Sequence, residues 1–300
     1  MDIEAHRKRY LSEIEGSAKE ASAATPEALA TYAASADHDA QRMCDMIRTL
    51  PLDDHSYQAS VRTLLDILAN DSLDTEPRLA ALAQLGAAEF QPVEFAEVHA
   101  EFIELLRRLS LSPDKKIRTA ALERLTLTND VEAQKLLREG LEKTRKPLVP
   151  AAKAIQLLAR DDHSGAMPLF RRLAADASGQ IREQALRALA SDTKSVPMFE
   201  SIAADKKEKT HLRQIAAANL KNTSTTRFAK LASNLALDDN EDDKLRAIAV
   251  AAITHTSEVA AKLKSPAFTK SLLALGSSTK SRALKASINR FSKTRETKKV

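Results

Sequence analysis

Two copies of the tetrapeptide Asp-Asp-His-Ser are the first residues in this sequence that could do chemistry. They occupy Asp53–Ser56 and Asp161–Ser164. A carboxylate beside an imidazole can ligate zinc or another transition metal. Both copies fall between expected helices, however, where Asp and Ser commonly cap a helix N-terminus, and they lie too far apart in the chain to share one ion. We interpret both as helix caps and expect no metal site.

A run of acidic residues over 238–243, Asp-Asp-Asn-Glu-Asp-Asp, has the composition of a calcium loop. It lacks the Gly at the sixth place and the Glu at the twelfth that an EF-hand loop requires. We expect a solvated turn that places negative charge at the start of a helix. The single cysteine, Cys44, has core-like spacing from Met43 and Ile47, which favours a buried structural thiol over a nucleophile.

No Walker motif, Gly-x-Ser-x-Gly elbow, HExxH or kinase signature occurs in the chain. We therefore expect no catalytic residues, no cofactor and no enzymatic activity. No apolar run approaches the ~18 residues that span a membrane, and the first residues lack the apolar stretch of a secretory signal. One cysteine suits a reducing compartment, so the expected location is the cytoplasm.

The composition favours helices. The 300 residues are 43% hydrophobic but only 4% aromatic, with no Trp and six Gly. An all-β sandwich or barrel would need more β-branched and aromatic residues, and a doubly wound nucleotide-binding fold would need Gly-rich turns. The charge is also uneven: residues 1–100 carry a net −10, residues 101–200 a net +4, and residues 201–300 a net +11.

One segment recurs through the chain: an apolar residue, Arg, a variable residue, and then small and apolar residues that end in Leu. Consecutive copies are separated by 31 to 40 residues. The Arg column reads Arg78, Arg118, Pro150, Arg182, Arg213, Arg246 and Arg282. A column of Ala follows three residues later in five copies, and a column of Leu or Ile follows seven residues later in six.

These offsets place the columns on one helical face, and a second apolar helix precedes each copy. Each unit is therefore a helical hairpin whose apolar faces must be covered by its neighbours. The sequence predicts an all-α fold, a right-handed α-solenoid of stacked hairpins over residues 61–290. Residues 1–60 are expected to form a divergent acidic cap, with helices over 3–23, 26–34 and 38–50, and residues 291–300 a basic tail.

The segment from Pro168 to Ala190 resembles a HEAT repeat, with Pro168 in the first helix, Asp176 at the turn and Arg182 early in the second helix. The resemblance covers roughly residues 60–290. It implies an Asp–Arg ladder between repeats, with Asp71 and Arg78 as a related pair and an incomplete ladder near residues 112–150. We also expect Leu189 and Leu220 to be buried and the guanidinium groups of Arg182 and Arg213 to stay partly exposed to solvent.

The resemblance also allows direct tests of enzymatic relatives. HEAT-type deoxyhypusine hydroxylases bind iron through His-Glu pairs, and none of the seven His here precedes a Glu. HEAT-like DNA glycosylases recognise alkylated purines with aromatic residues that include Trp, and this chain has no Trp. Bilin lyase subunits also carry HEAT-like repeats, so an accessory role in protein modification stays open.

Second helices line the concave face of a HEAT array, so the positions one and five residues after the Arg column are the candidate partner-binding surface. They are mostly small and uncharged, which favours a protein or peptide partner. The leading hypothesis is a monomeric, non-enzymatic scaffold that binds another protein there. The polar or charged candidates on this surface are Thr119, Glu123, Glu183, Arg187 and Gln214.

The alternative is an anion-binding module at the basic C-terminal end. From residue 261 onward the chain has eleven bases and one acid, Glu296. These bases could follow the phosphates of a nucleic acid, contact an acidic protein or serve solubility alone. The candidate contact residues are Lys280, Lys285, Arg290 and Lys293, all expected to be exposed.

Overall fold

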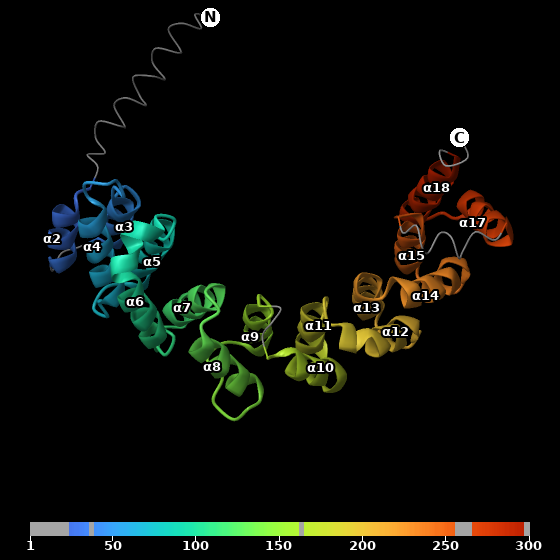
Figure 1. Ribbon diagram of the computed structural model, residues 1–300, viewed down its shortest axis with the longest axis horizontal. Helices are drawn as coiled ribbons and strands as arrows, with labels where there is room; N and C mark the ends of the chain where they lie inside the picture. The colour runs from blue at the N-terminus through green and yellow to red at the C-terminus, as the bar shows by residue number, and fades with distance from the viewer. Residues whose placement is uncertain (1–23, 36–38, 162–164, 256–265, 297–300) are drawn as a thin grey trace, which may run out of the picture. The chain divides into compact units, whose positions relative to one another are not determined.

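The structure is a computed structural model that describes residues 24–35, 39–161, 165–255 and 266–296. Within these ranges every regular element is a helix and there is no strand (Figure 1). The all-α fold of stacked helical pairs predicted from the repeat columns is confirmed. Two expected N-terminal helices are present as α2 (Pro26–Ala34) and α3 (Ala40–Arg48). The helix expected over residues 3–23 lies outside the described residues.

The chain divides into two compact units, residues 1–137 and 138–300, and α8 (Val131–Leu141) crosses the division. In unit 1, α4 (Tyr57–Ala69) packs against α5 (Thr75–Ala88), and α6 (Pro92–Leu109) packs against α7 (Lys115–Leu127). The two pairs stack because α4 contacts α6 and α5 contacts α7, while α2 and α3 pack against the first pair.

Unit 2 repeats the same arrangement. Its second helices α9, α11, α13 and α15 contact one another in series, and its first helices α12, α14 and α17 do the same. The second helices are α9 (Ala151–Leu158), α11 (Gly179–Ala188), α13 (Thr210–Thr223), α15 (Asp243–His255) and α18 (Arg282–Glu296). The first helices are α10 (Met167–Asp176), α12 (Val196–Ala204), α14 (Thr225–Leu237) and α17 (Pro266–Ser278), with a 3-10 turn, η1 (Thr193–Ser195), before α12.

Helix starts follow from local chemistry. The Thr25 hydroxyl accepts the backbone N–H of Ala28 at the start of α2, and the Asp39 carboxylate accepts that of Arg42 at the start of α3. Proline stands in the first turn of α10 and of α12, where its missing N–H removes no helical hydrogen bond. The helix α18 continues to Glu296, through residues that the sequence assigned to a tail.

The repeat columns form the core. All five members of the Ala column are fully buried, and so are the Leu and Ile that follow four residues later. Alanine at this place lets neighbouring helices approach closely, and the larger side chain one turn on fills the space between them. The Ala column is Ala81, Ala121, Ala185, Ala216 and Ala249. The Leu and Ile column is Leu85, Leu125, Leu157, Leu189, Leu220 and Ile253, with Lys153 at the Ala position before Leu157.

The Arg column contacts the end of the preceding helix. In four repeats the arginine Nε donates to a carbonyl in the last turn of the first helix of its own pair. The last carbonyls of a helix have no partner within the helix and carry its negative dipole end, so a cation suits them. The four contacts are Arg78 to Leu68 (3.1 Å), Arg182 to Ala174 (3.0 Å), Arg213 to Ala203 (3.1 Å) and Arg246 to Ala236 (3.4 Å).

The same arginines also pair with carboxylates, in two ways. Arg78 binds Asp71 at 2.7 Å, as the resemblance implied, within its own turn. Arg182 pairs at 2.6 Å with Glu208, in the turn before the next second helix, and not with Asp176. Two further pairs follow these patterns: Arg246 with Asp239 within one turn, and Arg213 with Glu241 across to the next. The carboxylate therefore ties successive pairs together in part of the array only.

Near residues 112–150 the arginine contacts change. Arg118 donates to the carbonyl of Ser112, beyond the end of α6, and Pro150 replaces the arginine before α9. Instead, Arg124 on α7 pairs with Glu89 at the end of α5 and joins the two repeats. Gly86 makes room for this arginine, since a Cβ there would lie 3.3 Å from its guanidinium carbon.

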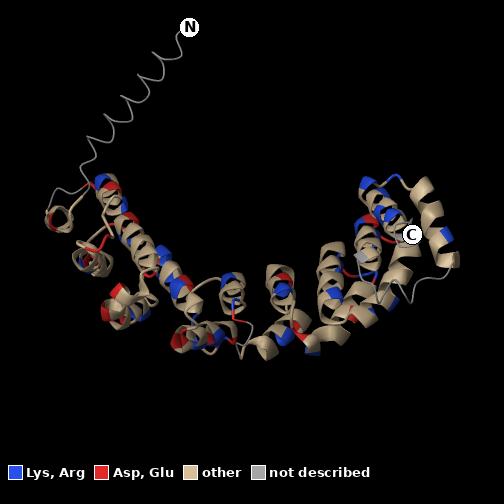
Figure 2. Ribbon diagram, turned by 45° about the horizontal axis from the view of Figure 1, so that its top comes forward, with Lys and Arg blue, Asp and Glu red and all other residues tan. Residues whose placement is uncertain are grey.

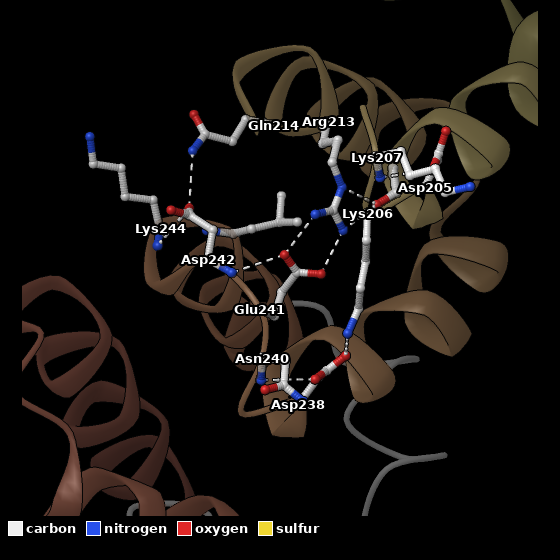
Figure 3. A network of polar contacts seen from close by, with 12 residues as sticks. Asp205, Lys206, Lys207, Arg213, Gln214, Asp238, Asn240, Glu241, Asp242 and Lys244 are labelled. Atoms are coloured by element: carbon white, nitrogen blue, oxygen red, sulfur yellow. Dashed lines mark hydrogen bonds and ion pairs between the residues drawn. The ribbon is translucent and has the colours of Figure 1, made fainter. Parts of the chain in front are cut away.

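Figure 3 shows the most buried of these pairs. The Arg213 side chain is 4% exposed and that of Glu241 is 2% exposed. Two parallel hydrogen bonds join them, from Nη1 to Oε1 at 2.7 Å and from Nη2 to Oε2 at 2.5 Å. The expectation that the Arg213 guanidinium group stays partly exposed to solvent is wrong, because the turn of the next repeat covers it. The Arg182 side chain is 23% exposed, so it does stay partly accessible to solvent.

Leu189 and Leu220 are fully buried, so replacing either by Ala should remove apolar contacts and leave a cavity. We expect each change to lower the free energy of unfolding by about 2–5 kcal/mol, measured by urea titration. Leu127→Ala serves as control because Leu127 is 57% exposed. Equal effects of the buried and exposed changes would mean that the repeat register is misassigned.

Arg213→Met should cost about 3–5 kcal/mol, because it leaves the Glu241 carboxylate buried without its partner. Adding Glu241→Met should recover part of this loss, since the second charge is then removed as well. Urea melts of both single variants and the double variant measure the coupling. Strictly additive effects would show that the two side chains do not interact in the folded protein.

Candidate functional site

The C-terminal ends of three successive second helices, α9, α11 and α13, surround a groove of about 700 Å³ in unit 2. Its lining mixes side-chain amides and hydroxyls with small apolar residues and one guanidinium. It includes Ile155, Gln156, Ala159, Gln184, Arg187, Ala188, Ala190, Ser191, Thr193, Asn222 and Thr223.

The groove follows from the repeat itself. Ala159, Ser191 and Asn222 each stand nine residues after the Arg-column position of their own repeat, at or just beyond a helix end. Ile155 and Arg187, four residues earlier at offset five, also line the groove, so both offsets contribute to one surface. Small residues such as Ala188 leave open the space that larger side chains would fill.

Of two predicted residues on α11, Arg187 lines the groove, whereas Glu183 is outside the lining and contacts His211 of the next repeat. Arg187 and Glu183 form an ion pair at 2.9 Å, one helical turn apart. The other Glu183 oxygen lies 3.5 Å from His211 Nε2 on α13. The Arg187 side chain is 55% exposed and that of His211 53%. Such solvated pairs add little to stability, so both side chains can be recruited by a partner.

The predicted residue Gln214 lies further along the row, where its amide donates to Asp242 at 3.4 Å. Asp242 also caps α15 by accepting the backbone N–H groups of Lys244 and Leu245 (Figure 3). The Gln214 side chain therefore connects α13 to the start of α15. It does not line the groove.

The remaining predicted residues lie elsewhere. Thr119 and Glu123 are half-buried on α7 in unit 1, and the Thr119 hydroxyl donates to the Lys115 carbonyl of its own helix. The four C-terminal bases are exposed, as expected, with Lys280 before α18 and Lys285, Arg290 and Lys293 on it.

Asp192 supports the edge of the groove beside Ser191 and Thr193. Its carboxylate accepts the Ser195 hydroxyl at 2.5 Å and pairs with Arg171 on α10 at 2.7 Å. Burial acts to raise the pKa of Asp192, but these hydrogen bonds and the Arg171 charge outweigh it, so the pKa lies below its ordinary value. The ionised form therefore holds the turn that contributes Ser191 and Thr193 to the groove lining.

The motifs that suggested metal chemistry have structural contacts. Asp53 accepts the backbone N–H groups of His55 and Ser56 and the Ser56 hydroxyl, all in the turn before α4. The interpretation of this copy as a helix cap is wrong, because the N-cap residue Ser56 makes no side-chain capping hydrogen bond and Asp53 stabilises the preceding turn. In the other copy, residues 162–164 lie outside the described residues. No group of three or more His, Cys, Asp or Glu side chains in the described part of the chain could hold a metal ion.

The acidic run before α15 is a network of caps and ion pairs. Asp238 binds Lys206 at 2.5 Å and accepts the backbone N–H of Asn240 (Figure 3). Asp239 pairs with Arg246. Glu241 and Asp242 are engaged as described above. Cys44 is buried, and loss of hydration raises the pKa of its thiol, as expected of a structural cysteine.

Sequence reasoning missed most of the groove, including Gln156, Gln184, Ser191 and Asn222. It examined only the positions one and five residues after the Arg column. The signal that could have found the groove is the column nine residues after it, which is small or polar in three successive repeats.

No protein family model matches the sequence, and no curated protein matches it. Among solved structures, the chain is similar to the complex of CpcE and CpcF of phycocyanin lyase from Nostoc sp. PCC7120. The identity is 19%, the match covers 90% of this chain and 94% of that chain, and the TM-score is 0.38. It is also similar to an engineered protein, at 15% identity over 90% of this chain and 83% of that chain, with a TM-score of 0.40.

The stacked pairs and their common register define the chain as an all-helical repeat protein. Among the described helices, none is both long and apolar enough to cross a membrane.

Asp192→Asn should lower the free energy of unfolding of unit 2 at pH 7 by about 1–3 kcal/mol. The change removes the negative charge that accepts the hydrogen bonds from Ser195 and Arg171. A carboxylate whose pKa is lowered by folding stabilises the protein above its unfolded pKa and loses this effect as pH falls through the folded pKa. The gap between parent and variant in urea melts should therefore shrink below pH ~4. A gap that stays constant into acid would contradict the assigned contacts.

Proposed function

We propose that this chain is a HEAT-like repeat scaffold that binds a segment of another protein in the groove at the ends of α9, α11 and α13. The observation that carries the proposal is the lining of that groove by equivalent positions of three successive repeats. A surface built by repetition suits an extended ligand, which can make the same type of contact with each repeat in turn.

The chemistry of the lining favours a peptide segment. The amides of Gln156, Gln184 and Asn222 each offer both donors and an acceptor, which match the N–H and C=O groups of an extended backbone. Ala188 and Ala190 leave room for side chains between them. Arg187, already near a carboxylate in the free protein, can exchange Glu183 for an acidic group of the partner.

The proposal includes no catalytic step. The described acidic motifs hold a turn, cap a helix or join repeats, so we propose that the chain supplies shape and hydrogen bonds. We also propose that the protein acts in the cytoplasm. Its single, buried Cys44 forms no disulfide and tolerates a reducing compartment.

Ser191→Trp should weaken capture of the partner from native lysate by about 10-fold or more, because the indole fills the groove. Ser191 is exposed just beyond α11, so the fold should persist. The matched control is Ser201→Trp, an equally large change at an exposed position on the first helix α12.

A photo-crosslinking residue at Asn222 should label the same partner, and one at the exposed Ala175 on α10 should not. If Ser191→Trp and Ser201→Trp retain the same partners equally, the groove is not the binding surface.

A further inference from the structure

The last helix, α18, carries an uninterrupted basic surface. Arg282, Lys285, Arg290 and Lys293 are exposed on the helix, and Lys280 is exposed in the turn before it. At 100° per residue the four helical bases fall within about 140° of the helix circumference. We call these five residues the α18 basic face.

The opposite side of α18 is apolar and covered. Leu284, Ile288 and Phe291 are buried, and the helix packs against α15 and α17. The packing therefore fixes the direction in which the bases point. They are held in solvent by a rigid helix, which reduces the entropy lost when a ligand orders them.

Four of the five charges of this face form no ion pair within the described part of the protein. Across the described residues, no carboxylate forms an ion pair with Lys280, Arg282, Lys285 or Arg290. The contrast with the rest of unit 2 is visible in Figure 2, where Lys and Arg elsewhere are interspersed with Asp and Glu. Arginines such as Arg182, Arg213 and Arg246 all have acidic partners.

The shape of the face indicates which anion fits it. Between the bases lie Ala283, Ala286 and Asn289, all exposed and none bulky and apolar, so the helix has no side chain to insert into a membrane. Single-stranded nucleic acid is held by aromatic stacking, but Phe268 and Phe291 are both buried and cannot stack on bases.

The face suits a ligand that presents regularly spaced charge and requires no insertion. From Arg282 to Lys293 the helix rises about 16 Å, a length over which a duplex presents about nine phosphate charges. We propose that the α18 basic face binds the phosphate backbone of double-helical nucleic acid, without reading its sequence. This inference is independent of the groove in the same unit.

The test is fluorescence anisotropy of a labelled 20-base-pair duplex, as DNA and as RNA, with the full chain between 50 and 200 mM salt. The logarithm of the affinity should fall linearly with the logarithm of the salt concentration. Replacing Lys280, Lys285, Arg290 and Lys293 by Gln should reduce the steepness of that line by about 3.6, or about 0.9 for each lost phosphate contact. Affinity at 50 mM salt should fall by about 10-fold or more.

The matched control replaces four exposed lysines that lie elsewhere, Lys135, Lys143, Lys146 and Lys230, by Gln. It makes the same change in net charge and should leave the slope nearly as in the parent. Far-ultraviolet circular dichroism confirms that both variants fold. Equal effects of the two variants would overturn the proposal, because binding would then follow net charge and not this face.

Two further outcomes would overturn it: tighter binding of the single strand than of the duplex, and no duplex binding by the parent at 50 mM salt. Binding of anionic vesicles in place of the duplex would assign the face to a lipid surface and would likewise contradict the proposal.

Discussion

An arginine side chain that reaches back to the end of the preceding helix is the contact on which the stacked pairs depend. In four repeats it donates to a carbonyl that the helix cannot satisfy itself, and a carboxylate then neutralises the guanidinium. This contact fixes the angle and the register of a helical pair at once. Where the carboxylate comes from the next turn, as Glu241 does for Arg213, it also fixes the following pair.

The common register of the second helices produces the groove. Column arginines contact the preceding helix in the repeats of α11 and α13, whereas Pro150 takes the place of the arginine before α9. Once the second helices α9, α11 and α13 stack in the same register, any position that is small or polar in each repeat becomes a continuous surface. The residues nine after the column satisfy this condition, and they meet where the helices end. The core columns and the groove therefore have one origin. The sequence repeats once per helical pair, and this repeat places equivalent residues both in the core and on the exposed side of each second helix.

The fold was predictable because its determinants are local and repeated. Ala and Leu columns such as Ala216 and Leu220 identify the buried face without any long-range information. The burial of Arg213 was not predictable in the same way, because Glu241, which covers it, lies 28 positions later in a turn outside the segment that defines the repeat. The site was predicted only in part: Arg187 lies on an examined column, whereas Ser191 and Asn222 follow it, near helix ends whose positions the sequence fixes poorly.

The central claim is that partner binding occurs at the ends of consecutive second helices in unit 2. The most direct measurement is hydrogen–deuterium exchange of the full chain, free and saturated with the partner it captures. The account predicts new protection in peptides from the last turns of α9, α11 and α13, with little change on the first helices α10, α12 and α14. Protection confined to the first helices, or to unit 1 alone, would contradict it.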